Sequence, residues 1–305
     1  MKNILVTGGT GFIGSAICSM LVKKGYRVTI FDNNSRGKYK NIISLKKAKF
    51  IRGDIRKYKE VFKACKGIDT VIHLAAVNGT KYFYEKPDVV LEVAAKGVIN
   101  IIECCIKKKI KNLFLASSSE VYHFPEKIPT DEKESIKIPD IMNPRFSYAG
   151  GKIFTELMGI NYGKHFKKLI IFRPHNVYGK NMGNEHVVPE FISRMRKNKS
   201  KNFFIKGSGK ETRAFIHIDD FIRAFEIIMK NGKHLEIYNI GTQQMVSINE
   251  LCKLISKIFK RRIRIKNKPI AAGGTKVRCP DISKLKKLGF KNYTLLEDGL
   301  RKVIN

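Results

Sequence analysis

The chain begins with the apolar run Asn3-Ile-Leu-Val-Thr7, which leads directly into Gly8-Gly-Thr-Gly11-Phe-Ile-Gly14. The first run has the β-branched character of a buried strand, and the helical pattern near 12–24 follows the glycines. Glycines at this spacing permit a tight turn and let a pyrophosphate approach the N–H groups of a helix N-terminus. Because the spacing alone is weakly specific, the strand before it and the helix after it carry the prediction. The stretch predicts a dinucleotide-binding unit.

An acidic residue follows at the position that such a unit requires. Asp32 closes the second predicted strand, 18 residues beyond Gly14, where a carboxylate can bond the ribose hydroxyls and favour NAD over NADP. Two alternatives stay open: Asp32 starts a turn, and Arg36 accommodates a 2′-phosphate. Asp54, after the third predicted strand, either lies near the adenine or caps the next helix.

The wider pattern predicts the fold. Short apolar runs alternate with helical stretches through the first two-thirds of the chain, which indicates a parallel sheet covered on both faces. We therefore predict an α/β fold: a Rossmann-type doubly wound parallel sheet with a smaller C-terminal α/β substrate lobe. Residues 1–175 form the predicted NAD-binding domain, and residues 176–305 form the second lobe, which shares some segments with the first. The strands are predicted at 4–7, 27–31, 49–52, 70–73, 113–117, 169–172, 202–206, 236–240 and 262–266.

Composition limits the class of protein. The 305 residues include 60 Lys and Arg against 26 Asp and Glu, a formal charge of +34, and 43% are hydrophobic, which excludes general disorder. The charge suggests nucleic acid or an anionic surface as partner. However, 45 of the bases are Lys and 15 are Arg, and they are scattered. Since Arg supplies the forks that suit phosphate and base recognition, a general Lys bias is an equally simple interpretation.

The sequence also indicates the compartment of the protein and the redox state of its cysteines. No apolar run reaches the length of about 18 residues that a membrane span needs, and the first strand begins almost at the initiator, unlike a signal peptide. The six cysteines form no CxxC pair and show no ligand spacing with His. We therefore expect reduced thiols, no metal site, no membrane partner and a cytoplasmic protein.

A Tyr and a Lys stand at helical spacing in Tyr148-Ala-Gly-Gly-Lys152, on one face of a helix. Action of the phenol as a base at neutral pH requires nearby cations that lower its pKa from about 10. A second match, Tyr82…Lys86, is interpreted as ordinary surface. Tyr148 is preferred because Ser118 precedes it by 30 residues, at the carboxyl end of a predicted strand, where doubly wound sheets bind ligands.

Together these segments resemble the extended short-chain dehydrogenase/reductases that modify nucleotide sugars. The matching segments are Thr7–Gly14, Gly53-Asp54-Ile55, His73-Leu-Ala-Ala76, Ser117–Tyr122, Tyr148…Lys152, Arg173-Pro-His-Asn176-Val-Tyr-Gly179, Arg213–Asp219, Tyr238-Asn-Ile-Gly241 and Arg278-Cys-Pro-Asp281. They cover nearly the whole chain in family order. The resemblance implies that NAD contacts Gly8, Gly11, Phe12, Ile13, Gly14, Asp32, Asp54, Ile55, Leu74, Ala75, Ala76 and Lys152.

The resemblance also implies a first chemical step. Tyr148 would take the proton of a sugar 4-hydroxyl while C4 gives hydride to NAD, and Ser118 would hydrogen-bond that oxygen. Lys152 would bind the nicotinamide ribose and lower the pKa of the Tyr. The residues implied to hold the nucleotide diphosphate are Asn176, Arg213 and Arg278. Relatives usually dimerise through helices that correspond to 88–109 and 148–166 here, so a homodimer is expected.

The second step is less defined by sequence. The 4,6-dehydratases carry an Asp where Ser119 stands, which argues against dehydration, whereas Ser119-Glu-Val-Tyr122 resembles the UDP-glucuronate decarboxylases. His186-Val-Val-Pro189 resembles the acid/base histidine segment of GDP-fucose synthase, and Glu120 occupies the position of its catalytic Cys. We hypothesise that Glu120 and His186 flank the sugar ring and move protons beside a 4-keto group.

Two departures bear on the substrate. Ala94 stands where many relatives have Asn, and the loop 77–84 is unlike the common epimerase form. The predicted function is an NAD-dependent nucleotide-sugar epimerase. The alternatives are a net C4 dehydrogenase, a UDP-glucuronate-decarboxylase-like enzyme and, in another class, a nucleic-acid-binding protein on a dinucleotide fold. The complete Ser118, Tyr148 and Lys152 set disfavours the last of these, because a binding module does not need it.

Overall fold

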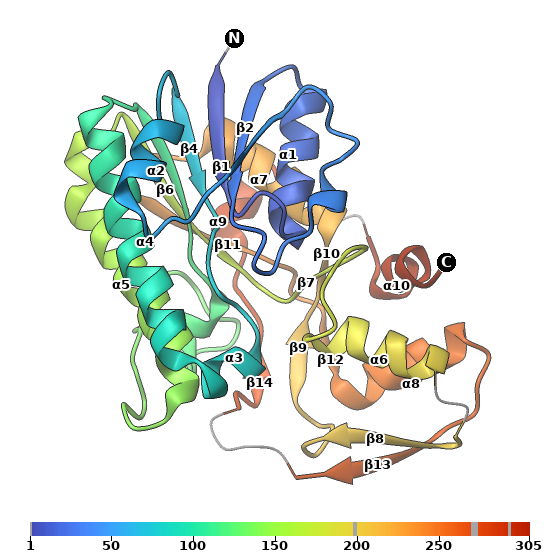
Figure 1. The fold of residues 1–305 in the computed structure, drawn as a ribbon. Coiled ribbons are helices and arrows are strands. Elements are labelled where there is room, and N and C mark those ends of the chain that lie inside the picture. The colour runs from blue at the N-terminus through green and yellow to red at the C-terminus, as the bar shows by residue number, and fades with distance from the viewer. Residues whose placement is uncertain (1, 198–199, 270–273, 292–293) are drawn as a thin grey trace.

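A parallel sheet organises the first lobe (Figure 1). The structure, a computed structural model, describes residues 2–197, 200–269, 274–291 and 294–305. Within these ranges, seven parallel strands are ordered β11-β6-β5-β4-β1-β2-β3. Their bounds are β1 Asn3–Thr7, β2 Arg27–Asp32, β3 Lys49–Arg52, β4 Thr70–His73, β5 Asn112–Ala116, β6 Lys168–Pro174 and β11 Glu236–Ile240.

Helices cover both faces of this sheet. Apolar side chains of α1 (Phe12–Lys23), α7 (Ile218–Asn231) and α9 (Ser283–Lys287) pack on one face. Those of α2 (Tyr58–Ala64), α4 (Pro87–Lys107) and α5 (Ser147–Tyr162) pack on the other. The central strands β1, β4, β5 and β6 are mostly buried apolar runs, as two covered faces require. The predicted doubly wound sheet is confirmed.

The second lobe has its own apolar core. Strongly amphipathic helices, α8 among them, contribute to this core. The start of α8 is fixed by a complete capping box between Ser247 and Glu250. The elements of this part are β7 Val177–Tyr178, α6 Val187–Lys197, β8 Asn202–Lys206, β9 Thr212–Ala214, β10 Ile216–His217, β12 Met245–Ser247, α8 Ile248–Ile258, β13 Arg264–Lys268, β14 Val277–Arg278 and α10 Leu296–Ile304. The strand expected at 262–266 begins two residues later, at Arg264.

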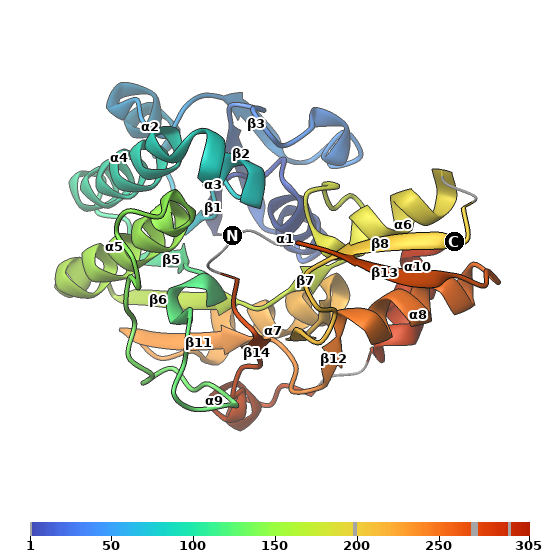
Figure 2. The same cartoon turned by 90° about the horizontal axis from the view of Figure 1, so that it is seen from below.

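The chain passes between the lobes more than once. After residue 176 it builds β7 and β8, returns with α7 and β11 to the large sheet, and then completes the second lobe (Figure 2). Segments beyond 175 therefore contribute to both lobes, and a division at that residue remains a proposal. In the part of the chain that the structure describes, no helix has the length and hydropathy to span a membrane.

Candidate active site

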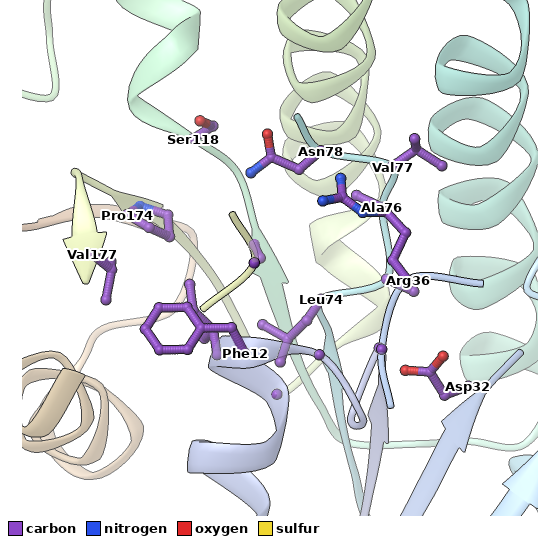
Figure 3. Close-up of a pocket in the computed structure, with 18 of the residues that line it drawn as sticks. Phe12, Asp32, Arg36, Leu74, Ala76, Val77, Asn78, Ser118, Pro174 and Val177 are labelled. Carbon is purple, nitrogen blue, oxygen red and sulfur yellow. The ribbon is translucent and has the colours of Figure 1, made fainter. Parts of the chain in front are cut away.

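A cleft of about 660 Å³ lies at the carboxyl ends of β1, β2, β4, β5 and β6. One wall comes from the β1–α1 turn and the segments that follow β2, β4 and β5, and the other includes residues 181–184 and His186. Figure 3 shows side chains from several of these segments directed into one space. The cleft includes all the predicted site residues except Arg213.

The glycine turn has the geometry of an anion cradle. Gly8 has φ +71°, and a Cβ at Gly14 would lie 2.1 Å from the Gly8 carbonyl oxygen, so neither position accepts a side chain. Gly11 immediately precedes α1, whose first residues, Phe12 and Ile13, also line the cleft. The helix N-terminus therefore opens toward the cleft without obstruction, as binding of a pyrophosphate requires.

The acidic residue at the end of β2 is held in place. Asp32 accepts hydrogen bonds from the backbone N–H groups of Thr10 (3.0 Å) and Asn34 (2.8 Å). Arg36 points away from Asp32 (Figure 3), pairs with Glu185 and lies 4.9 Å over the Tyr82 ring. Because its guanidinium is engaged elsewhere, accommodation of a 2′-phosphate by Arg36 is not favoured. The Asp32 carboxylate, oriented by two backbone N–H groups, fits NAD.

Asp54 lines the same end of the cleft but has a partner of its own. Its carboxylate forms an ion pair with Arg56 at 2.7 Å, and this hydrogen-bonded pair lowers the pKa of Asp54 to about 2. The Asp54 side chain does not cap α2, whose N-cap is Lys57. Of the other residues predicted to contact NAD, the following also line the cleft: Ile55, Leu74, Ala75 and Ala76.

Tyr148, Ser118 and Lys152 meet where β5 ends. Tyr148 is 7% exposed, Ser118 lines the cleft beside it, and the Tyr148 ring stacks on Phe83 with centroids 4.9 Å apart. Lys152 is also buried, donates to the Ala116 carbonyl at 2.7 Å, and has its Nζ 5.8 Å from the Tyr148 ring centroid. The arrangement places a phenol, a hydroxyl and an ammonium beside the cradle.

Burial dominates the ionisation of this pair. Desolvation raises the pKa of Tyr148 to about 12, although the Ser118 hydrogen bond and the charges of Arg36 and Arg278 oppose the rise. Desolvation also lowers the pKa of Lys152 to about 8, opposed by the Glu156 carboxylate. The lowering of the Tyr148 pKa that the sequence attributes to Lys152 is thus not found in the protein alone.

The raised pKa of Tyr148 leads to a prediction that a titration can test. We expect no phenolate from Tyr148 between pH 7 and about 10 in the protein alone, because its pKa lies well above the ordinary value. With NAD⁺ bound, the added positive charge should bring the titration into that range. The measurement is near-ultraviolet difference absorbance of the protein minus its Tyr148→Phe variant, with and without NAD⁺. A phenolate step in that range without NAD⁺ contradicts the expectation.

A charged pair, Glu120 and Arg278, also lines the cleft. Arg278 donates to Glu120 at 2.7 Å, and Arg145 lies 3.8 Å from the other carboxylate oxygen. Burial alone would raise the pKa of Glu120, but the two guanidinium groups lower it to about 2. Desolvation lowers the pKa of His186, which lines the same cleft. At neutral pH Glu120 is an anion and His186 is neutral, so both are proton acceptors.

Of the three residues predicted to hold a diphosphate, two line the cleft and one does not. Asn176 lines the cleft with φ +41°, and Arg278 lines it beside Glu120. Arg213 instead donates to the carbonyls of Thr212 at 2.8 Å and Thr275 at 2.7 Å. It is not among the residues that line the cleft, and its role in binding a diphosphate stays a prediction.

Sequence reasoning missed the support beneath the site. Arg173, in β6, makes two hydrogen bonds to Glu156, in α5, at 2.8 and 2.6 Å, and both side chains are buried. Arg173 also donates to the Tyr122 hydroxyl at 2.6 Å, and Glu156 accepts from Ser117. This network joins α5, which carries Tyr148 and Lys152, to the ends of β5 and β6. The sequence did carry a signal for this network, because Arg173 and Glu156 each interrupt an otherwise apolar pattern.

One of the two departures from the family pattern, Ala94, lies where two helices pack closely. The ideal Cβ position at Gly151 lies 2.6 Å from the Cβ of Ala94, so α4 and α5 approach too closely there for a side chain on Gly151. Phe83, from the unusual loop 77–84, stacks on Tyr148. Ala94 therefore contacts the helix that carries Tyr148, and the loop 77–84 contacts the Tyr148 ring itself.

A glycine turn at a helix N-terminus, an acid at the end of the second strand and a buried Tyr/Ser/Lys set in one cleft are features of a Rossmann-fold enzyme that uses a dinucleotide. A family model described as the NAD dependent epimerase/dehydratase family matches residues 4–241, and the chain belongs to this family. Its cofactor is NAD.

The relatives define the substrate class. The chain is 36% identical to a putative UDP-glucose 4-epimerase of Methanocaldococcus jannaschii, covering 99% of this chain and 97% of the relative. It is 32% identical, at the same coverage, to a UDP-N-acetyl-alpha-D-glucosaminuronate decarboxylase of Bacillus cytotoxicus. The structure of UDP-glucose 4-epimerase from Thermotoga maritima with UDP-glucose superposes with a TM-score of 0.90 at 29% identity, covering 99% and 97% of the two chains. The protein is an NAD-dependent enzyme that modifies nucleotide sugars.

Proposed function

We propose that the protein is a nucleotide-sugar 4-epimerase, which oxidises C4 of the sugar and returns the hydride to the same carbon. The observation that carries this proposal is the buried Tyr148 phenol, which lines the cleft together with Ser118 and the glycine cradle. NAD, when bound, supplies the hydride acceptor. The 36% identical relative, named as a putative UDP-glucose 4-epimerase, supports the same outcome.

The residues have distinct parts in this reaction. Tyr148 takes the proton of the sugar 4-hydroxyl, and Ser118 donates a hydrogen bond to the oxygen as its charge develops. Lys152, fixed by the Ala116 carbonyl, holds positive charge next to the phenol and the nicotinamide ribose. Returning the proton from Tyr148 on re-reduction restores the enzyme, so no further acid/base pair is required.

A bridge across the cleft favours retention of the cofactor. Arg36 follows the strand that ends at Asp32, whereas Glu185 belongs to the opposite wall, and the two side chains form an ion pair. Gly79 lies against both side chains: a Cβ there would be 2.6 Å from Glu185 and 3.1 Å from Arg36. An enzyme that re-reduces its own intermediate needs such retention, and a net dehydrogenase does not.

The bridge gives a prediction for cofactor release. Arg36→Glu should place two carboxylates opposite each other and increase the rate of NAD release by about 10-fold, since like charges repel across the cleft. The double variant Arg36→Glu with Glu185→Arg should restore slow release. Dialysis followed by assay of bound NAD measures both. Equal release from the protein and both variants contradicts the role of the bridge.

One observation favours a second function, decarboxylation of a nucleotide uronic acid. Glu120 and Arg278 form an ion pair at 2.7 Å, and Arg145 lies next to it. The Arg278 guanidinium, which lines the cleft beside Glu120, suits a carboxylate on C6 of the sugar. The 32% identical relative named as a decarboxylase is consistent with this alternative.

Three labelled substrates distinguish the outcomes. The enzyme is incubated with UDP-glucose, UDP-N-acetylglucosamine and UDP-glucuronate, each carrying deuterium at C4, and the products are identified by NMR. Epimerisation inverts C4 and keeps the deuterium, decarboxylation releases CO₂, and net dehydrogenation moves deuterium into free reduced cofactor. Solvent deuterium at C3 or C5, in a parallel run in D₂O, tests proton transfer by Glu120 and His186. Turnover without inversion at C4 refutes the epimerase proposal.

We further propose a cytoplasmic homodimer. Exposed apolar side chains lie along α4 and α5, at Leu91, Leu157 and Ile160, on the helices expected to pair. Light scattering of the protein and of a Leu157→Lys/Ile160→Lys variant tests this, because charges in the interface should yield monomers. A monomeric parent protein contradicts the proposal.

A further inference from the structure

The second lobe carries an outlying two-stranded sheet, which we term the basic ribbon: β8 (Asn202–Lys206) and β13 (Arg264–Lys268). The strands are parallel, with Arg264 opposite Asn202, Lys266 opposite Phe204 and Lys268 opposite Lys206. The ribbon lies beneath α6 and α8 at the outer edge of the lobe (Figure 1). None of its residues lines the active-site cleft, so the chemistry described above does not explain its composition.

The two segments that form the ribbon contain no acidic residue. Residues 191–210 include seven Lys and Arg, and residues 251–280 include ten, whereas neither range has an Asp or Glu. Strand pairing brings β8 and β13 of these two ranges together, although about 60 residues separate them. The fold therefore concentrates positive charge that the sequence alone shows as scattered.

Alternation along the strands sorts the side chains onto two faces. Phe203 and Ile205 are buried in the core of the second lobe, which fixes the ribbon to a firm base. The neighbouring positions are exposed and basic: Lys206, Arg264, Lys266 and Lys268. Among the residues that the structure describes, none of these four forms an ion pair.

An aromatic ring lies within the basic face. Phe204 is 41% exposed, and the Lys268 ammonium lies 4.6 Å from the centre of its ring. A half-exposed Phe surrounded by cations has the character of a membrane-interface anchor, in which the ring enters the headgroup region and the lysines meet anionic lipids.

We propose that the basic ribbon docks the enzyme on an anionic lipid surface. A flat, outward face with mostly Lys charges fits a diffuse layer of lipid headgroups, where each cation adds attraction without a fixed partner. Nucleic acid is favoured less, because single strands bind in grooves with several stacking rings and Arg forks, and this face offers one ring. Docking through the ribbon uses no residue that lines the cleft.

Vesicle sedimentation tests this docking. The full-length enzyme is mixed with phosphatidylcholine vesicles that contain about 30% phosphatidylglycerol, and with phosphatidylcholine alone, at about 100 mM salt. The variant replaces Lys206, Arg264, Lys266 and Lys268 with Gln. The matched control replaces four exposed lysines of the first lobe, Lys46, Lys47, Lys63 and Lys66, with Gln, so the net charge falls equally.

We expect the enzyme and the control variant to sediment with anionic vesicles only. The ribbon variant should lose at least about 100-fold in partitioning, since each of the four cations contributes roughly fivefold. Retained NAD content and turnover in both variants show that they are folded. Equal losses in the two variants, no sedimentation of the parent enzyme, or binding of single-stranded RNA in place of vesicles would each overturn the proposal.

Discussion

Replacing Tyr148 with Phe should reduce turnover of the nucleotide sugar by about 1,000-fold, within the range that a positioned acid/base group provides. The phenol lines the cleft together with Ser118, and its ring packs on Phe83. Phe keeps the ring and its stacking contact but removes the proton acceptor. Binding of NAD should therefore change little. Steady-state rates and NAD titration by fluorescence or calorimetry measure the two effects separately.

The chain provides a matched control for this experiment. Tyr82 is also followed by a Lys four residues later, but its ring lies under Arg36, and a Tyr82→Phe change preserves that contact. We expect near-normal turnover from Tyr82→Phe. If Tyr148→Phe keeps more than about a tenth of the activity, an effect below the usual size for acid/base catalysis, Tyr148 is not the base.

Replacing Glu156 with Gln should destabilise the protein by about 3–5 kcal/mol, as expected when one partner of a buried ion pair loses its charge. Arg173 and Glu156 are 2% and 3% exposed and share two hydrogen bonds. Gln keeps the size of the side chain but leaves the guanidinium without a compensating charge. For a chain of this length the loss corresponds to a fall in Tm of about 5–8 °C. Thermal unfolding followed by circular dichroism measures it.

A partly exposed pair provides the comparison. Glu190 and Arg194 lie 3.1 Å apart one turn from each other on α6, and their side chains are 39% and 34% exposed. Glu190→Gln should cost less than about 0.5 kcal/mol, because solvent screens such pairs. Equal losses from the two variants would mean that the buried network does not stabilise the protein as a unit. Retained NAD binding by Glu156→Gln would place its effect on stability and not on the cradle.

The sequence predicted the strands, helices and turn of the first lobe because these depend on local patterns. The apolar runs, the helical periodicity and the glycines after Thr7 each act within a few residues. Spacing from a recognisable element also predicted three site residues: Asp32, Tyr148 and Lys152. Phe83 gave no such signal, because its contact with Tyr148 joins segments 65 residues apart.

The sequence by itself therefore determined a doubly wound dinucleotide fold and the residue types of its site. Only the tertiary structure decided how the charges are used. Packing paired Arg173 with Glu156 and Arg278 with Glu120, and it turned Arg213 toward backbone carbonyls. It also gathered scattered lysines onto one strand face. The physical reason is that a charge acts through its distance to other groups and its burial, and both are set by segments far apart in the chain.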